Sequence, residues 1–166
     1  MSSLLTTLGL RPNPLGFTPN LAPYHVIAQF FFAFVFLSAR SLKNSYKIDH
    51  NISPREDLTK YGEKYVQDGK LTRKQLNLLK RNEAAHANSM EHFPVFVGSV
   101  LFATVSAVKP EVINGVCLAY GVARLVYAAA YLLVDRDVRL SYVRSLSWWA
   151  GSLAIAAGDS DLAPLN

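Results

Sequence analysis

The sequence predicts an all-α integral membrane protein built as a four-helix bundle, and two observations lead to this prediction. Hydrophobic residues make up 51% of the 166 residues and charged residues only 17%, whereas soluble domains carry about 25% charged residues. The charges are also absent from long blocks of the chain, among them residues 21–39 and 92–108. Blocks of this length without charge are suited to the interior of a membrane.

The positive charge is pooled in one part of the chain. The net charge is +5, and 11 of the 17 basic residues lie between residues 40 and 81. A membrane protein places its basic residues between spans in this way, and a nucleic-acid-binding surface has no reason to. We therefore expect no nucleic-acid partner. The composition also excludes disorder, and the single cysteine, Cys117, excludes a disulfide framework.

The first two expected spans differ in character. A helix needs about 20 mainly apolar residues to cross the hydrocarbon core, and residues 21–41 supply them, with Gln29 as the one strongly polar residue near the centre. Residues 76–108 form the second span, which is polar in its first half and apolar from Phe93 onward. We expect Pro110 to end this helix, because proline blocks its continuation.

The third span covers residues 112–134, where Arg124 is the only charge, and the fourth covers residues 141–157. The alternative is a soluble bundle with long buried helices. Phe30-Phe31-Phe32 and the apolar third span leave no solvent-facing side for a soluble helix, so we favour the membrane protein.

The remaining segments complete the expected organisation. Residues 1–20 form an irregular N-terminal segment that is not a signal peptide, because it has no long apolar run. Residues 21–158 form a single transmembrane domain, and residues 159–166 a short tail. Within the domain, residues 42–75 form a long polar loop with a short amphipathic helix expected at residues 55–66. The excess of Lys and Arg predicts that this loop is cytosolic and that both termini lie on the opposite side.

Polar side chains recur at membrane depth, where they are expensive and by default indicate a site. The second span carries Arg81, Asn88 and Glu91, spaced at 7 and 3, and helical geometry places such positions on one face. The third carries Arg124, Tyr127 and Tyr131, spaced at 3 and 4. The fourth begins with Arg144 and Ser145.

Each group also has a structural interpretation. The arginines could extend to lipid headgroups, the tyrosines could belong to an aromatic belt, and Glu91 could pair with Arg124. Taken together, however, the cations, amide, carboxylate and phenols suit an anionic, peptide-like ligand. Arginine binds carboxylates bidentately, and Glu91 can receive an ammonium group.

These residues resemble a known family. The pattern Arg81-x6-Asn88-x2-Glu91-x2-Pro94, then Arg124-x2-Tyr127-x3-Tyr131, then Arg144-Ser145, is similar to that of the MAPEG family, the membrane-associated proteins in eicosanoid and glutathione metabolism. Asn51-Ile52-Ser53-Pro54-Arg55 resembles a loop element of a broad bacterial and fungal branch of this family.

The resemblance implies a four-helix protomer that assembles as a homotrimer, with glutathione bound between neighbouring protomers. It implies an integral multi-pass membrane protein, located in the endoplasmic reticulum if the cell is eukaryotic. The residues that it implies for glutathione binding are Arg40, Arg81, Asn88, Glu91, Arg124, Tyr127 and Tyr131.

The implied activity is that of a glutathione-dependent transferase or peroxidase acting on hydrophobic electrophiles that arrive from the bilayer. Arg144 resembles the arginine that stabilises the glutathione thiolate, and Ser145 could assist by hydrogen bonding. A nearby cation lowers the pKa of a thiol and so increases the fraction of reactive thiolate. No metal site is expected, because His86 and His92 do not share a helical face.

Two departures from the family pattern leave alternatives open. Glutathione-using members often carry a second arginine at the position of Ala84, and the segment from Tyr131 to Arg144 is longer than in the eicosanoid enzymes. The alternatives are a biosynthetic enzyme of specialised metabolism that does not use glutathione, and a non-catalytic lipid-binding protein.

Overall fold

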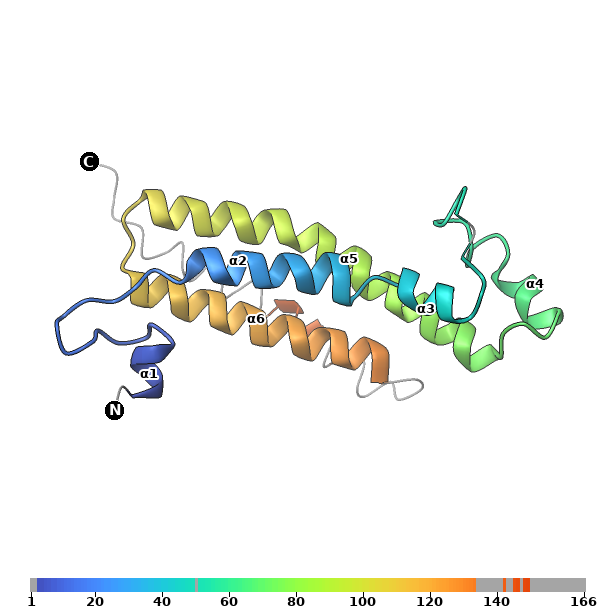
Figure 1. The fold of residues 1–166 in the computed structure, drawn as a ribbon, viewed down its shortest axis with the longest axis horizontal. Helices are drawn as coiled ribbons and strands as arrows, with labels where there is room; N and C mark the ends of the chain where they lie inside the picture. The colour runs from blue at the N-terminus through green and yellow to red at the C-terminus, as the bar shows by residue number, and fades with distance from the viewer. Residues whose placement is uncertain (1–2, 50, 134–141, 143–144, 147, 150–166) are drawn as a thin grey trace.

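The computed structural model describes residues 3–49, 51–133, 142, 145–146 and 148–149. All regular secondary structure in these residues is helical, as the sequence predicts. The helices are α1 (Leu4–Thr7), α2 (Ala22–Phe31), η1 (Phe32–Phe36), α3 (Arg40–Ser45), α4 (Gly62–Gln67), α5 (Arg73–Val105) and α6 (Pro110–Leu133). In Figure 1, α2, α5 and α6 run side by side along the molecule, with α3 and α4 at one end and α1 at the other.

The first expected span is helical but interrupted. α2 begins with a proline in its first turn, where the missing N–H has no helical partner to lose. It continues directly into η1, a π-helical turn, and the helix then breaks at residues 37–39 before α3 begins. The expected span, residues 21–41, therefore covers α2 and η1 and stops at the start of α3.

The second expected span lies within one uninterrupted helix, α5. Thr72 caps its start: the Thr72 hydroxyl accepts a hydrogen bond from the N–H of Gln75, and the Gln75 side chain accepts one from the N–H of Thr72. This capping box moves the start of the helix to Arg73. At 33 residues, α5 is about 50 Å long, so it exceeds the roughly 30 Å hydrocarbon core.

The end of α5 differs from the prediction. The helix stops at Val105, and Ala107 has a positive φ of 56° in the connection that follows. Pro110 begins α6 instead of ending α5, which suits proline because the first helical N–H is unpaired in any case. The expected third span, residues 112–134, lies almost entirely within α6.

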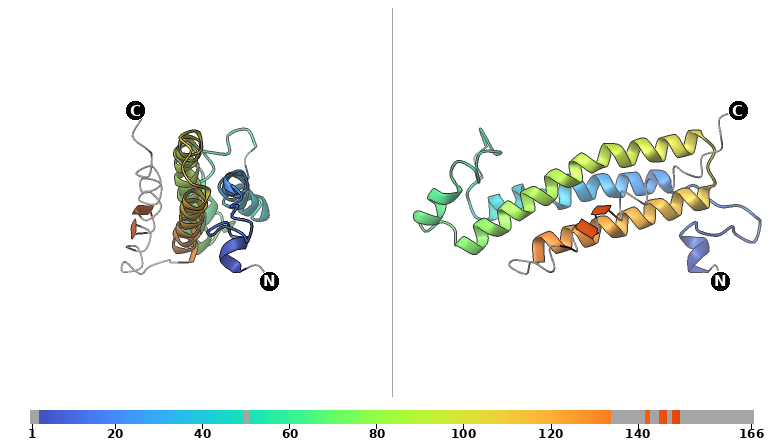
Figure 2. Two further views of the ribbon diagram at one scale, coloured as in Figure 1. Left: turned by 90° about the vertical axis from the view of Figure 1, so that its left-hand side faces the viewer. Right: turned by 180° about the vertical axis from the view of Figure 1, so that it is seen from behind.

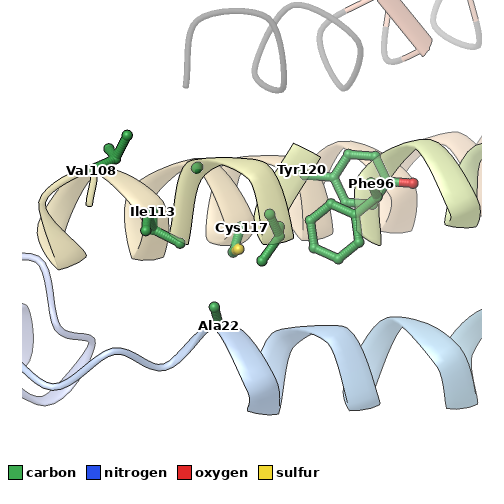
Figure 3. Packing of buried hydrophobic residues seen from close by; sticks show 8 residues of the cluster. Ala22, Phe96, Val108, Ile113, Cys117 and Tyr120 are labelled. Carbon is green, nitrogen blue, oxygen red and sulfur yellow. The ribbon is translucent and has the colours of Figure 1, made fainter. Parts of the chain in front are cut away.

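The apolar core lies where α2, α5 and α6 meet. The Phe96 ring of α5 stacks on the Tyr120 ring of α6, with centroids 4.2 Å apart and planes 5° from parallel. Figure 3 shows this pair beside Cys117 and Ile113, with Ala22 of α2 facing them. All of these side chains are buried. The stack of Phe96 on Tyr120 therefore fixes the register of α5 against α6.

The polar loop carries a second, smaller core. Its members are Ile48, Leu58, Leu71, Leu76 and Leu79. The helix expected at residues 55–66 is displaced: residues 54–60 form turns, and α4 covers only Gly62–Gln67. This small core packs the loop onto the first turns of α5, which extend beyond the rest of the bundle.

Two helical segments in the described part of the chain are long and apolar enough to cross a membrane, Ala22–Ser45 and Pro110–Leu133. They correspond to the first and third predicted spans. The apolar half of α5 runs beside them, as Figure 1 and the right-hand view of Figure 2 show. The fourth predicted span, residues 141–157, lies mostly outside the described residues.

Candidate functional site

Arg124 is the central polar residue between α5 and α6. Its side chain is 1% exposed. One guanidinium nitrogen, Nη2, donates hydrogen bonds to Asn88 Oδ1 at 3.0 Å and to Ser89 Oγ at 2.8 Å. The guanidinium carbon also lies 4.4 Å from the centroid of the Tyr127 ring, which is within the range of a cation–π interaction.

The charge of Arg124 is not neutralised within the described residues. Its two hydrogen-bond partners are neutral, and none of the described ion pairs includes it. The second nitrogen, Nη1, is buried and has no hydrogen-bond partner in this part of the chain. A buried guanidinium needs an anion or a full set of acceptors, so this site is suited to an anionic ligand.

The helical repeat of α5 explains why these groups meet. Ala85, Ser89 and Phe96 are fully or nearly buried, and their spacing of 4 and 7 places them on the side of α5 that faces α6. Ala85 is small enough to allow close approach of the two helices, and Ser89 supplies a hydroxyl where a larger side chain would block Arg124. The Phe96–Tyr120 stack closes the apolar side of the site.

Arg81 lies two turns before Asn88 and also contacts α6. Its Nε donates a hydrogen bond to the backbone oxygen of Tyr131 at 2.9 Å, close to the end of α6 at Leu133. This hydrogen bond joins the polar half of α5 to the last described turn of α6. Tyr127 and Tyr131, whose ring centroids lie 4.9 Å apart, share the same side of α6, as their spacing predicts.

Glu91 lies apart from these residues. Three residues of a helix turn through about 300°, which leaves Glu91 about 60° from Asn88 around the axis. Its side chain is exposed and lines a cavity of about 490 Å³ together with Lys43, Arg55, Glu83 and His86, among others. In the described structure Glu91 forms no ion pair with Arg124, so the single face expected for Arg81, Asn88 and Glu91 is divided between two surfaces.

Arg40 is held by the polar loop of its own chain. It donates a hydrogen bond to Asn51 and lies 3.5 Å from the carboxylate of Asp49. Lys43, one turn later and almost fully buried, pairs with Glu83 and Asp57 and donates to the backbone oxygen of Pro54. The Asn51–Arg55 element is thereby fastened to α3 and α5.

Ser145 is exposed and lines a second cavity of about 260 Å³ with Tyr127, Tyr131, Trp148 and Trp149. This cavity brings three of the predicted site residues together: the two tyrosines and Ser145. The other predicted catalytic residue, Arg144, lies outside the described residues.

Two residues of this site were not predicted from the sequence. Ser89 is a direct partner of Arg124. His92 lies one turn further along α5, its ring packs edge-on against Trp148 at 5.0 Å, and its Nδ1 has no hydrogen-bond partner among the described residues. The i, i+3 and i, i+4 spacing of Ser89 and Asn88 to His92 could have identified it. No cluster of three potential metal ligands occurs in the described residues.

The fold and site thus define a membrane-embedded helical protein with a buried cationic site. The sequence pattern of the MAPEG family matches residues 22–158, which is most of the chain, and the protein belongs to the MAPEG family. Membership places it among membrane proteins of eicosanoid and glutathione metabolism. No curated protein and no solved structure matches the chain.

Proposed function

We propose that this protein is a membrane-bound, glutathione-dependent transferase or peroxidase that acts on hydrophobic electrophiles. The observation that carries the proposal is Arg124, a fully buried guanidinium with an unpartnered Nη1 and no carboxylate partner among the described residues. A carboxylate of glutathione is a ligand of the required charge and geometry.

The surrounding residues support a peptide ligand. Asn88 offers an amide and Tyr127 and Tyr131 offer phenols beside Arg124, while Arg81 adds a second cation about two turns away. His92 adds an imidazole whose buried Nδ1 has no hydrogen-bond partner among the described residues. These groups can bind the carboxylates and amides of a tripeptide, while Glu91 is the carboxylate suited to its ammonium group.

The separation of Glu91 from Arg124 supports a site that two chains complete. We propose a homotrimer in which Arg40 and the cavity lined by Glu91 on one protomer approach Arg124 of the next. The side of α5 that carries Glu91 also exposes Val95, Phe102 and Val105. An apolar stripe of this kind is suited to a neighbouring protomer or to lipid.

Glutathione, when bound, would supply a thiolate nucleophile for an electrophile that enters from the bilayer. Arg144 would favour the thiolate by its positive charge, and Ser145 would donate a hydrogen bond to it. The 260 Å³ cavity beside Ser145 is largely walled by aromatic rings, which suits the hydrophobic second substrate. We place the protein in the endoplasmic reticulum if the cell is eukaryotic.

One observation favours a second candidate function. Ala84 is exposed on α5, where the family pattern often has an arginine. Without that cation the protein could be a biosynthetic enzyme of specialised metabolism that does not use glutathione, or a lipid-binding protein without catalytic activity.

The thiolate fraction of bound glutathione tests the catalytic assignment. In the wild-type protein, the ultraviolet absorbance of the thiolate should appear on adding glutathione at neutral pH. Arg144→Ala should leave binding largely intact and raise the pKa of the bound thiol. Arg136→Ala serves as a control for loss of a basic residue from the same segment. If Arg144→Ala binds glutathione with an unchanged thiolate fraction, the role of Arg144 is wrong and the binding site remains.

A further inference from the structure

The N-terminal segment, residues 3–21, contains a turn that is closed by its own hydrogen bonds and exposes apolar side chains. Asn13 Oδ1 accepts hydrogen bonds from the backbone N–H groups of Leu15 and Phe17, at 2.9 and 3.0 Å. The turn that these bonds close projects the side chains outward, with Leu15 90% and Phe17 63% exposed. Leu4 of α1 is also largely exposed. Turns that face water normally carry polar side chains on their outer side.

One buried side chain, that of Asn114, forms three of the hydrogen bonds that attach this segment to the bundle. Asn114 of α6 is completely buried. Its Nδ2 donates to the backbone oxygens of Gly9 and Pro19, and its Oδ1 accepts from the N–H of Leu21. The Thr18 hydroxyl donates to Glu111, one turn earlier in α6. The exposed leucines and phenylalanine are therefore presented on a fixed structure.

The point of attachment places the segment beside a membrane-spanning helix. Glu111 and Asn114 lie in the first turns of α6, and the side chain of Leu10 approaches Gly115. In Figures 1 and 2 this segment lies at the end of the bundle opposite α3 and α4. α2, which follows the segment directly in the chain, also exposes Tyr24 and Ile27.

Exposed cations accompany the apolar residues. Arg11 lies within the segment, and Lys109 immediately precedes α6. Cations and aromatic or apolar residues alternate in this way at the boundary between headgroups and acyl chains. Both cations are exposed and take part in none of the ion pairs of the described residues. The phosphate groups of lipid headgroups are therefore suitable partners for them.

We propose that residues 3–21 form an interfacial anchor that binds the lipid surface at the end of the bundle opposite the polar loop. Leu4, Leu15 and Phe17 enter the boundary between headgroups and acyl chains, and Arg11 and Lys109 contact the headgroups. The anchor limits the tilt and depth of α6, because Asn114 couples the two. It does not depend on the bound ligand.

The test uses the full-length protein in vesicles of phosphatidylcholine and phosphatidylglycerol, with and without bromine on the upper acyl chains. A polarity-sensitive fluorophore is attached at Leu15→Cys in a Cys117→Ala background. The matched control carries the label at Asp68→Cys, which is exposed in the polar loop. Phe17→Cys gives a second reporting position should Leu15→Cys impair folding.

The proposal predicts blue-shifted emission and loss of most of the fluorescence in brominated vesicles at Leu15 and Phe17, and neither change at Asp68. The label should lie within about 5–10 Å of the headgroup boundary. Asn114→Ala should restore part of the fluorescence by releasing the segment. Emission at Leu15 and Phe17 equal to that at Asp68 would overturn the proposal. Blue-shifted emission without bromine quenching would also overturn it, because another protein chain would then cover the segment.

Discussion

Arg124 joins the two longest helices and carries the proposed ligand site. Removing it deletes the buried charge that a glutathione carboxylate would meet. Loss of a charge-assisted hydrogen bond costs about 1.5–3 kcal/mol, and each 1.4 kcal/mol is about tenfold in affinity. We therefore expect Arg124→Ala to weaken glutathione binding by at least about tenfold, as measured by calorimetry on the detergent-solubilised protein.

Ser89→Ala provides the control for Arg124→Ala. It removes one neutral partner of the guanidinium and leaves the charge in place, so its effect on glutathione affinity should be smaller. Thermal unfolding of both variants in the same detergent separates loss of binding from loss of structure. Equal affinities for Arg124→Ala and wild-type protein would remove Arg124 from the site.

Gly9 has a role that its neighbour in the same segment, Gly16, does not share. Both adopt a positive φ, +65° and +74°, which costs a residue with a side chain about 1–2 kcal/mol. A Cβ added at Gly9 would in addition lie 2.3 Å from Asn114 Nδ2. A Cβ added at Gly16 would have no other atom within 4 Å. Gly9→Ala should therefore lower the thermal unfolding midpoint more than Gly16→Ala does. Equal midpoints would show that Asn114 does not hold the segment.

At this scale the sequence predicted only part of the site. The spacing of Arg124, Tyr127 and Tyr131 placed them together, because steps of 3 and 4 return to one side of a helix. The steps of 7 and 3 from Arg81 to Asn88 and Glu91 both fall short of whole turns and add up to about 80°, so Glu91 lies away from the face expected for it. Ser89 and His92 were missed because neutral polar residues do not stand out in the polar half of α5.

At the scale of the elements, Lys43 holds the polar loop against α5. Lys43 is almost fully buried and pairs with Asp57 and Glu83. Removing one partner of a buried ion group costs about 3–5 kcal/mol. Lys43→Met should therefore release the loop and increase its rate of cleavage by an added protease.

Lys60→Met is the matched control for Lys43→Met. Lys60 pairs with Glu56 on the exposed surface of the same loop, where solvent screens the two charges and the pair contributes little to stability. Its cleavage rate should stay near that of the wild type. Equal protection of the loop in both variants would show that the buried ion group does not fasten it.

The contact between α4 and α5 should depend on pH through Glu63. Hydrogen bonds from Arg73 and then Lys80 lower the pKa of Glu63 from its ordinary value of 4.5. A carboxyl whose pKa is lower in the folded state stabilises that state above its unfolded pKa, and this stabilisation is lost as the pH falls through the folded value. Hydrogen-exchange protection of α4 should therefore decrease below about pH 4.5. Glu63→Gln should abolish this dependence, and an unchanged profile in that variant would exclude Glu63 as its cause.

The elements were predicted unevenly, for reasons that particular residues show. α5 and α6 follow the predicted spans because their apolar blocks are long and a proline lies between them. The break at residues 37–39 was not predicted, because no glycine or proline occurs between Tyr24 and Ser53. Pro110 was read as the end of one helix, but α5 had already ended through the positive φ of Ala107.

At the scale of the whole molecule, the proposed ligand site requires more than one chain. Chemical cross-linking of the detergent-solubilised protein should trap a species of three chains. The stripe of α5 that contains Val95 and Phe102 is suited to this contact. Gly98→Trp, on the same exposed side, should reduce the trimer if neighbouring protomers pack there. A stable monomer that retains full glutathione binding would contradict an intersubunit site.

The number of chains could not be predicted from residue spacing, because an apolar stripe serves a protein neighbour and lipid equally well. The membrane character could be predicted, since exclusion of charge from long blocks is a property of the sequence itself. The ligand could be predicted in part: Arg124 is a buried cation with no carboxylate partner in the described part of the chain, which indicates an anionic ligand but does not identify it.

Calorimetric titration of glutathione into the wild-type, full-length protein in detergent tests the central claim most directly. We expect saturable binding at or below millimolar glutathione, and competition by a glutathione conjugate that carries the same carboxylates. Absence of binding at millimolar concentration, from protein that cross-linking and thermal unfolding show to be assembled and folded, would contradict the proposed function.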